Sequence, residues 1–475
     1  MPRKSKRMER LKVVNPDCAG IDIGKDRHYV AVDPERCAEP VRSFDGFTRD
    51  LKAMAAWLRS CGVKKVAMES TSVYWIPVYE VLERAGFEVL LVPPRMTKQI
   101  ARRKSDVLDC QWIWQLLSYG LLRGAFRPGD AVCPLRAYVR QAKRLIEDRV
   151  RCVQHMQKAL TEMNVRLDSV LADIMGQTGQ KILRAIIGGE RDAQRLASFR
   201  HRQVKASGDT IAASLEGTWR EEHLFALEQA MQRYDFCQQQ IDVCEAQIAA
   251  QIGRLTPPED STDDSPSGDE GPADGSAGEG WKTLSRTGGK KSAAGDKALT
   301  MALHEMMGVD LTAIPAIGTR TALTIASEIG PDFSAFPSAQ HFCSWLGVAP
   351  RTRISGGKPL PGRLPKVVNP VGQALRMAAM AARRSQTFIG ARHRARLARK
   401  DRAVAITATA RELACLIYLM VTRGEEYVEK GMDAYEKRCI DRTFANLSRK
   451  ARTLGYCLVQ AAQHQETPNG APAAD

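Results

Sequence analysis

The sequence predicts an α/β domain followed by two mainly helical regions. Short apolar segments of strand length alternate with segments of helical periodicity up to about residue 130, which is typical of α/β architecture. An apolar seven-residue repeat then runs over residues 221–255, and Ala- and Met-rich segments of helical length fill the C-terminal part. We place the boundaries at residues 11–132 for the α/β domain, 133–255 for a helical coiled-coil region, 256–298 for a linker and 299–465 for a mainly helical domain.

The strands of the α/β domain carry two acidic side chains. Residues 18–32 are predicted as strand, Gly-containing turn and strand, and Asp22 lies within the first strand with its apolar neighbours on the opposite face. Glu69 ends a short apolar strand at 63–68. Ligands of α/β sheets bind at the carboxyl ends of strands, so both acids are candidates for a site. The domain is completed by helices at 51–61 and towards residue 84, and by a strand at 88–92.

Two further acids begin the next predicted helix. Asp106 and Asp109 stand three residues apart before the apolar run 110–122, so they share one helix face. The ordinary alternative is that they only complement the helix macrodipole, which needs no function. If they converge with Asp22 and Glu69, four carboxylates would repel one another unless divalent cations were bound. Such oxygen ligands suit Mg²⁺ or Mn²⁺, and a two-metal site serves phosphodiester transfer.

The middle region is predicted as two long helices. The first runs over about 135–174, and the second over 221–255 with apolar residues every seven positions from Leu227 to Leu255. Gln238 and Glu245 weaken this seam. The repeat is compatible both with packing inside one chain and with assembly of several chains, so both alternatives stay open.

A segment at 311–330 suggests contact with a phosphate backbone. Its I-P-A-I-G turn followed by A-S-E-I-G resembles a helix-hairpin-helix, in which Gly318 and Arg320 would stand at the N-terminus of the second helix. Helix N-termini bind phosphates through free N–H groups and the helix dipole. A plain helical turn is the alternative.

One stretch presents a serine amid positive charge. Ser355 precedes two glycines, and residues 349–369 contain no carboxylate. A basic surface loop whose serine satisfies a turn is the simpler interpretation; a serine offered to an anionic substrate is the functional one. The basic side chains of this stretch are candidates for holding phosphate: Arg351, Arg353, Lys358, Arg363 and Lys366.

Charge and composition favour nucleic acid as the partner. The formal net charge is +16, and residues 341–402 contain fourteen Lys or Arg against the single acid Asp401. A membrane surface is the competing partner, but we find no apolar run of about 18 residues and no signal region. We therefore expect a cytoplasmic protein. The twelve cysteines show no zinc spacing, and Cys18 and Cys110 fit packing better than metal binding.

Taken in order, the motifs resemble one family. G-I-D-I-G-K, M-E-S-T-S-V-Y-W, K-S-D-V-L-D, I-P-A-I-G with A-S-E-I-G, and S-G-G resemble the DEDD transposases of the insertion-sequence one-ten family. The resemblance implies a ribonuclease-H-like (RuvC-like) first domain, with Asp22, Glu69, Asp106 and Asp109 as metal-binding acids and Ser355 as nucleophile. It also implies a coiled-coil region that assembles a dimer or tetramer, a site shared between protomers, a noncoding guide RNA, and action in the bacterial cytoplasm at the nucleoid.

The sequence departs from this family after the serine. Val368 stands where the family has a glycine, and the loop contains additional prolines, although Asn369 matches.

Three functions remain to be separated. The first is a recombinase that excises and integrates DNA through a phosphoserine intermediate. The second is a metal-dependent junction-resolving nuclease in which the acids activate water. The third is a nucleic-acid-binding protein without catalysis.

Overall fold

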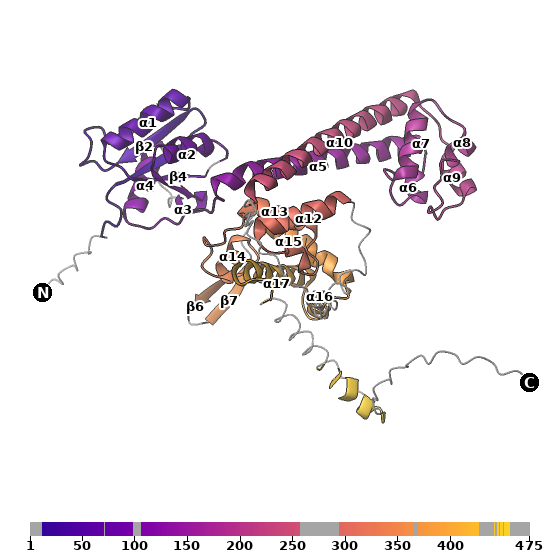
Figure 1. Ribbon diagram of the computed structural model, residues 1–475. Helices are drawn as coiled ribbons and strands as arrows, with labels where there is room; N and C mark the ends of the chain where they lie inside the picture. Colours follow the sequence, from indigo (N-terminus) through magenta and orange to yellow (C-terminus); the bar gives the residue numbers. More distant parts are fainter. Residues whose placement is uncertain are drawn as a thin grey trace, which may run out of the picture. The chain divides into compact units, whose positions relative to one another are not determined.

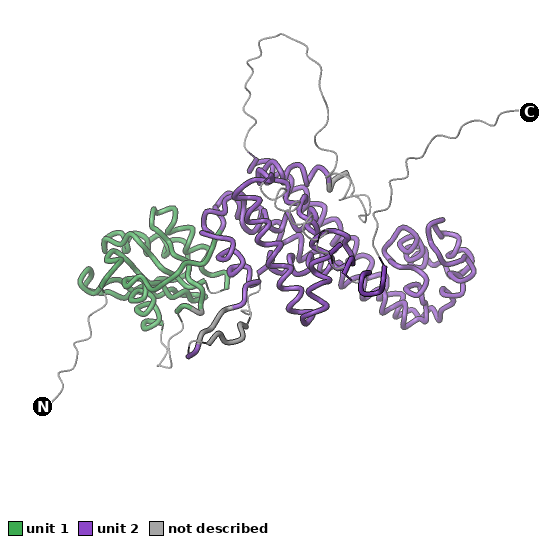
Figure 2. Tube along the Cα trace, turned by 90° about the horizontal axis from the view of Figure 1, so that it is seen from below, with its two compact units in different colours: residues 1–127 green, residues 128–475 purple. Residues whose placement is uncertain are grey.

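The computed structural model describes residues 12–70, 72–97, 106–256, 294–356, 358–363, 369–426, 441, 444–445, 447–449 and 451–456. The chain divides into two compact units, residues 1–127 and 128–475, which Figure 2 colours separately. The basic N-terminal arm, most of the acidic linker and the C-terminal tail that the sequence suggests lie outside the described residues.

The first unit is built on a five-stranded mixed sheet in the order β3-β2-β1-β4-β5. β1 pairs antiparallel with β2 and parallel with β4, and β4 pairs parallel with β5. The α/β prediction is therefore confirmed, but strand β3 was not predicted because its V-R-S-F-D segment is polar and has no buried residue. The strands are β1 (Cys18–Ile23), β2 (Arg27–Val32), β3 (Val41–Asp45), β4 (Lys65–Glu69) and β5 (Glu88–Val92).

Helices cover both faces of this sheet. Helices α1 (Thr48–Ser60) and α2 (Trp75–Arg84) share a core with Ile21 and Ile23 on one face. Helix α4 (Asp106–Ser118) packs against Cys18 on the other, and α3 (Pro94–Thr97) follows β5. Asp106 and Asp109 occupy the first turn of α4, as the sequence predicted.

In the second unit, helix α5 (Cys133–Glu162) follows a short 3-10 turn, η1 (Asp130–Val132), and ends earlier than predicted. The chain turns at Asn164, which has a φ of 58°, so the predicted continuation to residue 174 is wrong. The apolar stripe beyond that point belongs instead to the core of a small helical group. Its helices are α6 (Leu167–Val170), α7 (Gln177–Ile187), α8 (Ala193–Ala197) and α9 (Gly208–Ser214).

Helix α10 (Glu221–Leu255) has the predicted bounds and lies along α5 (Figure 1). Its buried side chains include Leu227, Ile241 and Ile248, which belong to the seven-residue repeat. Packing inside one chain thus accounts for this seam. Arg149 of α5 donates a hydrogen bond to the seam residue Gln238, which satisfies its polar side chain.

The C-terminal part of the second unit is mainly helical, as predicted. Helix α12 begins at Ala294, inside the range predicted as linker. Helix α17 is long and apolar enough by length and composition to cross a membrane, contrary to our reading of the sequence, but its buried side chains pack against its neighbours. The elements are α12 (Ala294–Met307), η2 (Leu311–Ala313), α13 (Thr319–Ile329), α14 (Ala339–Trp345), β6 (Arg351–Ser355), β7 (Lys358–Arg363), α15 (Pro370–Ala381), η3 (Ala382–Arg384), α16 (Phe388–Leu397) and α17 (Arg402–Arg423).

Candidate functional site

Strand β1 and strand β4 place two carboxylates side by side. Their parallel register pairs Ile21 with Met68, and Asp22 and Glu69 each follow that pair by one residue. The two acids therefore occupy neighbouring positions at the carboxyl ends of two adjacent strands.

A close approach of helix α4 brings the other two acids to the same face. A Cβ on Gly20 would lie 2.2 Å from the backbone N of Trp114 and 2.5 Å from the carbonyl oxygen of Cys110, so only glycine lets the helix pack here. Side chains alternate along a strand, so Asp22 points to the face that α4 covers. The first turn of α4 carries Asp106 and Asp109.

The pKa of Asp22 reflects all three of the other acids. Burial, followed by the negative charges of Asp106, Asp109 and Glu69 in that order, raises the pKa of Asp22 to about 6. Four predicted site acids thus interact within the first unit.

Glu69 has a partner that the sequence did not reveal. The hydroxyl of Thr97, at the end of α3, lies 2.5 Å from the Oε2 atom of Glu69 and donates to it. Thr97 is buried, so this contact fixes one carboxylate oxygen of Glu69. No sequence signal marks Thr97, because it lies 28 residues beyond Glu69 in an undistinguished P-R-M-T segment.

The donor set suits a hard divalent cation. Carboxylate oxygens are the ligands that Mg²⁺ and Mn²⁺ prefer. Burial first, and the charges of the other three acids second, raise the pKa of Asp22, and a bound cation would offset both effects. Within the described ranges, however, no three His, Cys, Asp or Glu side chains are clustered tightly enough to enclose an ion.

The two cysteines beside these acids are packing residues, as predicted. Burial raises the pKa of Cys18 and of Cys110 to about 12, so both thiols stay protonated at neutral pH. The Cys110 thiol donates to the carbonyl oxygen of Val107 within its own helix. Neither cysteine is available as a thiolate ligand.

Ser355 lies in the second unit, at the end of a strand rather than in an irregular loop. Strands β6 and β7 form an antiparallel hairpin in which Ser355 pairs with Lys358. Gly356, directly after Ser355, has a φ of 55°, a left-handed conformation that favours glycine. The side chain of Ser355 is exposed. The hairpin therefore holds the hydroxyl at its tip.

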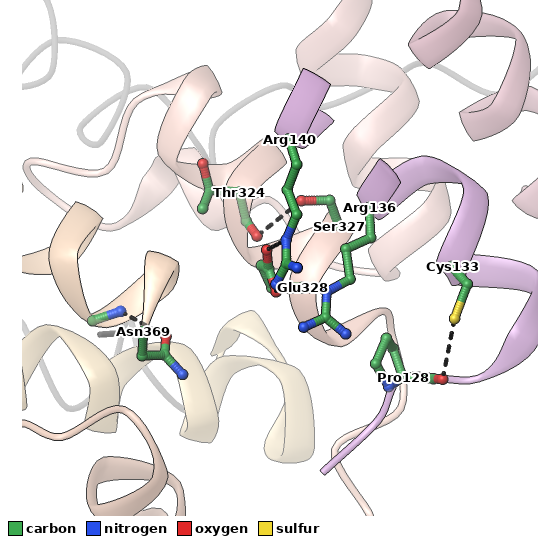
Figure 3. Close-up of polar contacts among 9 residues, drawn as sticks. Pro128, Cys133, Arg136, Arg140, Thr324, Ser327, Glu328 and Asn369 are labelled. Atoms are coloured by element: carbon green, nitrogen blue, oxygen red, sulfur yellow. Dashed lines mark hydrogen bonds and ion pairs between the residues drawn. The ribbon is translucent and has the colours of Figure 1, made fainter. Parts of the chain in front are cut away.

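The basic candidates around Ser355 fall into two groups. Arg351, Arg353, Lys358 and Arg363 belong to the two strands of the hairpin. Lys366 and Val368 lie outside the described residues. Asn369 follows and caps α15, because its Oδ1 atom accepts a 3.0 Å hydrogen bond from the backbone N–H of Gly372 (Figure 3). This asparagine anchors the chain where it leaves the serine hairpin.

The helix-hairpin-helix-like segment has the predicted form. The turn η2 is followed by α13, with Gly318 as its N-cap residue and no side-chain cap. Arg320 is mostly exposed and lies 3.4 Å from Glu245 of α10, a surface ion pair of small energetic value. The N-terminal amides of α13 are therefore free of a capping side chain.

A buried ion-pair cluster fixes α13 to α5. Arg140 donates two hydrogen bonds to the carboxylate of Glu328, at 2.7 and 2.8 Å, and the Nε atom of Arg136 lies 2.9 Å from the same group (Figure 3). The Glu328 side chain is only 4% exposed. Nothing in the sequence pairs these residues, because 188 positions separate Arg140 from Glu328.

Two models of protein families match the chain. The model of the DEDD transposases of the IS110 group, described as "Transposase", matches residues 19–165. The model described as "Transposase IS116/IS110/IS902 family" matches residues 308–394. Among curated proteins, none matches the chain. The first match contains all four acids and the second contains Ser355. Members of the DEDD group are typically metal-dependent, and transposases act on DNA. The chain therefore belongs to the IS110 family of transposases.

Proposed function

We propose that this transposase breaks and rejoins DNA through a covalent phosphoserine link at Ser355. The observation that carries the proposal is the exposed position of this serine at the tip of a hairpin whose strands supply four Lys and Arg residues. A hydroxyl at a tip can enter the groove of a duplex, whereas neighbouring cations hold phosphate oxygens.

The proposed step conserves both charge and bond energy. The Oγ atom of Ser355 attacks phosphorus, an Oγ–P bond forms, and the bond from phosphorus to the 3′ oxygen breaks. The proton lost by serine balances the proton gained by the released 3′ hydroxyl. The reverse attack by a 3′ hydroxyl restores a phosphodiester, so strand exchange needs no ATP.

The four acids complete the proposed site. Asp22, Glu69, Asp106 and Asp109 would hold Mg²⁺ or Mn²⁺, which when bound lowers the pKa of a hydroxyl and neutralises phosphate charge. Thr97 orients Glu69 by hydrogen bonding one of its oxygens. Burial and the other three acids raise the pKa of Asp22 to about 6, so a neighbouring positive charge would favour its ionised form.

Further features of the proposal follow the family resemblance. The mixed sheet with acids at the carboxyl ends of parallel strands supports a ribonuclease-H-like first domain. Assembly of protomers is supported by an apolar stripe on the outer face of α10, formed by the exposed Phe225, Phe236 and Val243. We include in the proposal a site shared between protomers and guidance by a noncoding RNA.

The test is detection of the covalent adduct. Labelled element-end DNA is incubated with the full chain and Mg²⁺, and the products are separated under denaturing conditions. Ser355→Ala should abolish the protein–DNA adduct and retain DNA binding, whereas Ser334→Ala, a change at an exposed serine of the same unit, should leave the adduct unchanged. Persistence of the adduct in Ser355→Ala would remove Ser355 from this role.

A junction-resolving nuclease is the second candidate, favoured by the interaction of all four acids within one unit without Ser355. Its products would be free ends with no adduct, and they would form equally with Ser355→Ala. Asp22→Asn should abolish Mg²⁺-dependent cleavage under either candidate, but would leave a purely DNA-binding protein unaffected.

A further inference from the structure

A pocket of about 560 Å³ lies among η3, α15, α16 and α17, and nothing in the proposed recombination chemistry uses it. Its volume falls in the range of small-molecule sites. The apolar part of its wall is formed by Met377, Met380, Leu397 and Ile406. Both methionines are substantially exposed, with 59% and 39% of their surface open to solvent. Thioethers at an open apolar surface make favourable contacts with aromatic rings.

Three guanidinium groups, those of Arg383, Arg384 and Arg402, also line the pocket, and no carboxylate does so among the described residues. Within that part of the chain, none of the three forms a salt bridge. By contrast, Arg392 and Arg396 of the same region are both paired with Glu412. The pocket arginines therefore keep their full charge available for an anion.

One buried polar side chain faces the pocket. His393 is 2% exposed and is a lining residue. Its Nδ1 atom lies 2.9 Å from the hydroxyl of Thr409, which is itself fully buried and accepts an N–H from Arg396 at 2.9 Å.

These contacts determine which ring nitrogen carries the proton. A guanidinium can only donate, so the Thr409 hydroxyl donates its own proton to Nδ1 of His393, its one remaining partner among the described residues. Burial and the charges of Arg396, Arg383 and Arg394 lower the pKa of His393, so the ring is neutral at pH 7 and carries its proton on Nε2. Nε2–H has no acceptor within the described chain and is a donor available to a ligand in the pocket.

We propose that this pocket accepts one unstacked nucleotide of a single-stranded nucleic acid. The thioether and aliphatic wall would contact the face of the base, Nε2–H of His393 would donate to a base oxygen, and the arginines would hold the flanking phosphates. The combination of an apolar wall with two thioethers, one buried donor and several guanidinium groups that form no salt bridge with the described residues matches a nucleotide better than a bare phosphate, which needs no apolar wall.

The inference rests on the proposed function only in taking nucleic acid as the partner. Binding of the full chain is measured by fluorescence anisotropy with labelled single-stranded oligothymidylate and with an abasic strand of equal length. Thymine offers carbonyl oxygens to Nε2–H, whereas the abasic strand keeps only the phosphates. We expect about tenfold tighter binding of the base-bearing strand.

Two variants locate that preference. Ile406→Trp fills the pocket without a change in charge, and His393→Phe removes the donor while keeping a ring; each should reduce the preference to about twofold or less. Arg399→Ala, a change at an exposed arginine that does not line the pocket, should weaken both strands equally and keep the preference. Thermal unfolding of each variant checks that its fold is intact.

The outcomes separate this inference from the catalytic proposal. A preference that survives Ile406→Trp in a folded protein overturns the pocket as the base site. If free thymidine 5′-monophosphate competes as strongly as the strand does, the pocket binds free nucleotides. That result would overturn the proposal that it accepts a nucleotide within a strand. Ser355→Ala should keep the full preference, so failure of the adduct assay alone leaves the pocket inference standing.

Discussion

Arg140 and Glu328 form a two-bond ion pair that joins the start of α5 to the end of α13 (Figure 3). The carboxylate is buried and also lies beside Arg136, whose pKa is lowered by burial. The pair holds α13 against α5. Because we expect the N-terminus of α13 to bind phosphate, this contact would position a DNA-binding helix.

Glu328→Ala should destabilise the second unit by about 2–3 kcal/mol. Removal of one partner of a buried pair leaves uncompensated charge and costs about 3–5 kcal/mol, and we reduce this value because the Arg140 side chain is 47% exposed. Urea unfolding followed by circular dichroism measures the change. Asp148→Ala, which breaks the exposed bridge to Arg151 on the same helix, is the control and should cost less than about 1 kcal/mol. Equal effects of the two variants would contradict the structural role of Glu328.

Gly20→Ala should destabilise the first unit and displace the acids of α4. The added Cβ would meet backbone atoms of α4 at 2.2 and 2.5 Å, which no rotamer change can relieve, so the helix must move. Overpacking of this kind costs about 1–3 kcal/mol or more. Thermal unfolding measures the loss, and Mg²⁺-dependent activity should fall with it. Gly46→Ala is the matched control, because its Cβ would come no closer than 3.6 Å to any neighbour.

In the presence of a chelator, stability should fall as the pH rises through about 6. The folded-state pKa of Asp22 is raised from 3.8 to about 6, so its contribution to stability is complete below pH 3.8 and is lost as the pH rises through 6. Asp22→Asn should remove this dependence and be about 2–3 kcal/mol more stable at pH 8, since one pKa unit corresponds to about 1.4 kcal/mol.

Unfolding curves of the wild type and Asp22→Asn from about one pH unit below to about two units above the shifted pKa of about 6 test this. Added Mg²⁺ should stabilise the wild type at pH 8 and have little effect on the variant. A wild type whose stability is flat over that range would contradict the environment described for Asp22.

Phe236→Glu should weaken self-association of the chain. Phe236 is 59% exposed on the outer face of α10, in line with Phe225 and Val243, so a charge there costs nothing in the isolated chain but would be buried in an assembly. Light scattering after size-exclusion chromatography measures the mass as a function of concentration. Phe47→Glu, at an exposed phenylalanine of the first unit, is the control. An unchanged mass distribution would exclude this face from the interface.

The sequence predicted those parts of the fold whose local pattern and tertiary environment agree. The apolar run 88–92 predicted the observed bounds of β5. The apolar seven-residue repeat predicted those of α10. The end of α5 was missed because Met163, Leu167 and Ile174 keep a helical spacing although the chain turns at Asn164. They are buried in a core that α5, α7–α9 and α10 build together, and no local pattern relates them to the more distant of these helices.

For the candidate site, local sequence identified the charged groups but not their supports. Asp22 could be placed within a strand and Glu69 at the end of another, but the pairing of these two strands was seen only in the structure. Thr97, Gly20 and the Arg140–Glu328 pair could not be identified, since each acts through a contact between distant segments. Such contacts depend on the final packing and leave no periodic signal.

The antiparallel pair of α5 and α10 determines how far apart two contact points on α5 lie in the second unit. Arg140, which holds α13, and Leu160, in the core of the small helical group, lie twenty residues apart on one uninterrupted helix, about 30 Å at 1.5 Å per residue. The distance between these two residues along α5 is thus close to the length of one turn of duplex DNA, about 34 Å. Removal of one heptad from each helix would shorten the spacing by about 10 Å and leave the seam in register. The separation of these two ends is therefore set by the length of the two helices, independently of which side chains the helices display.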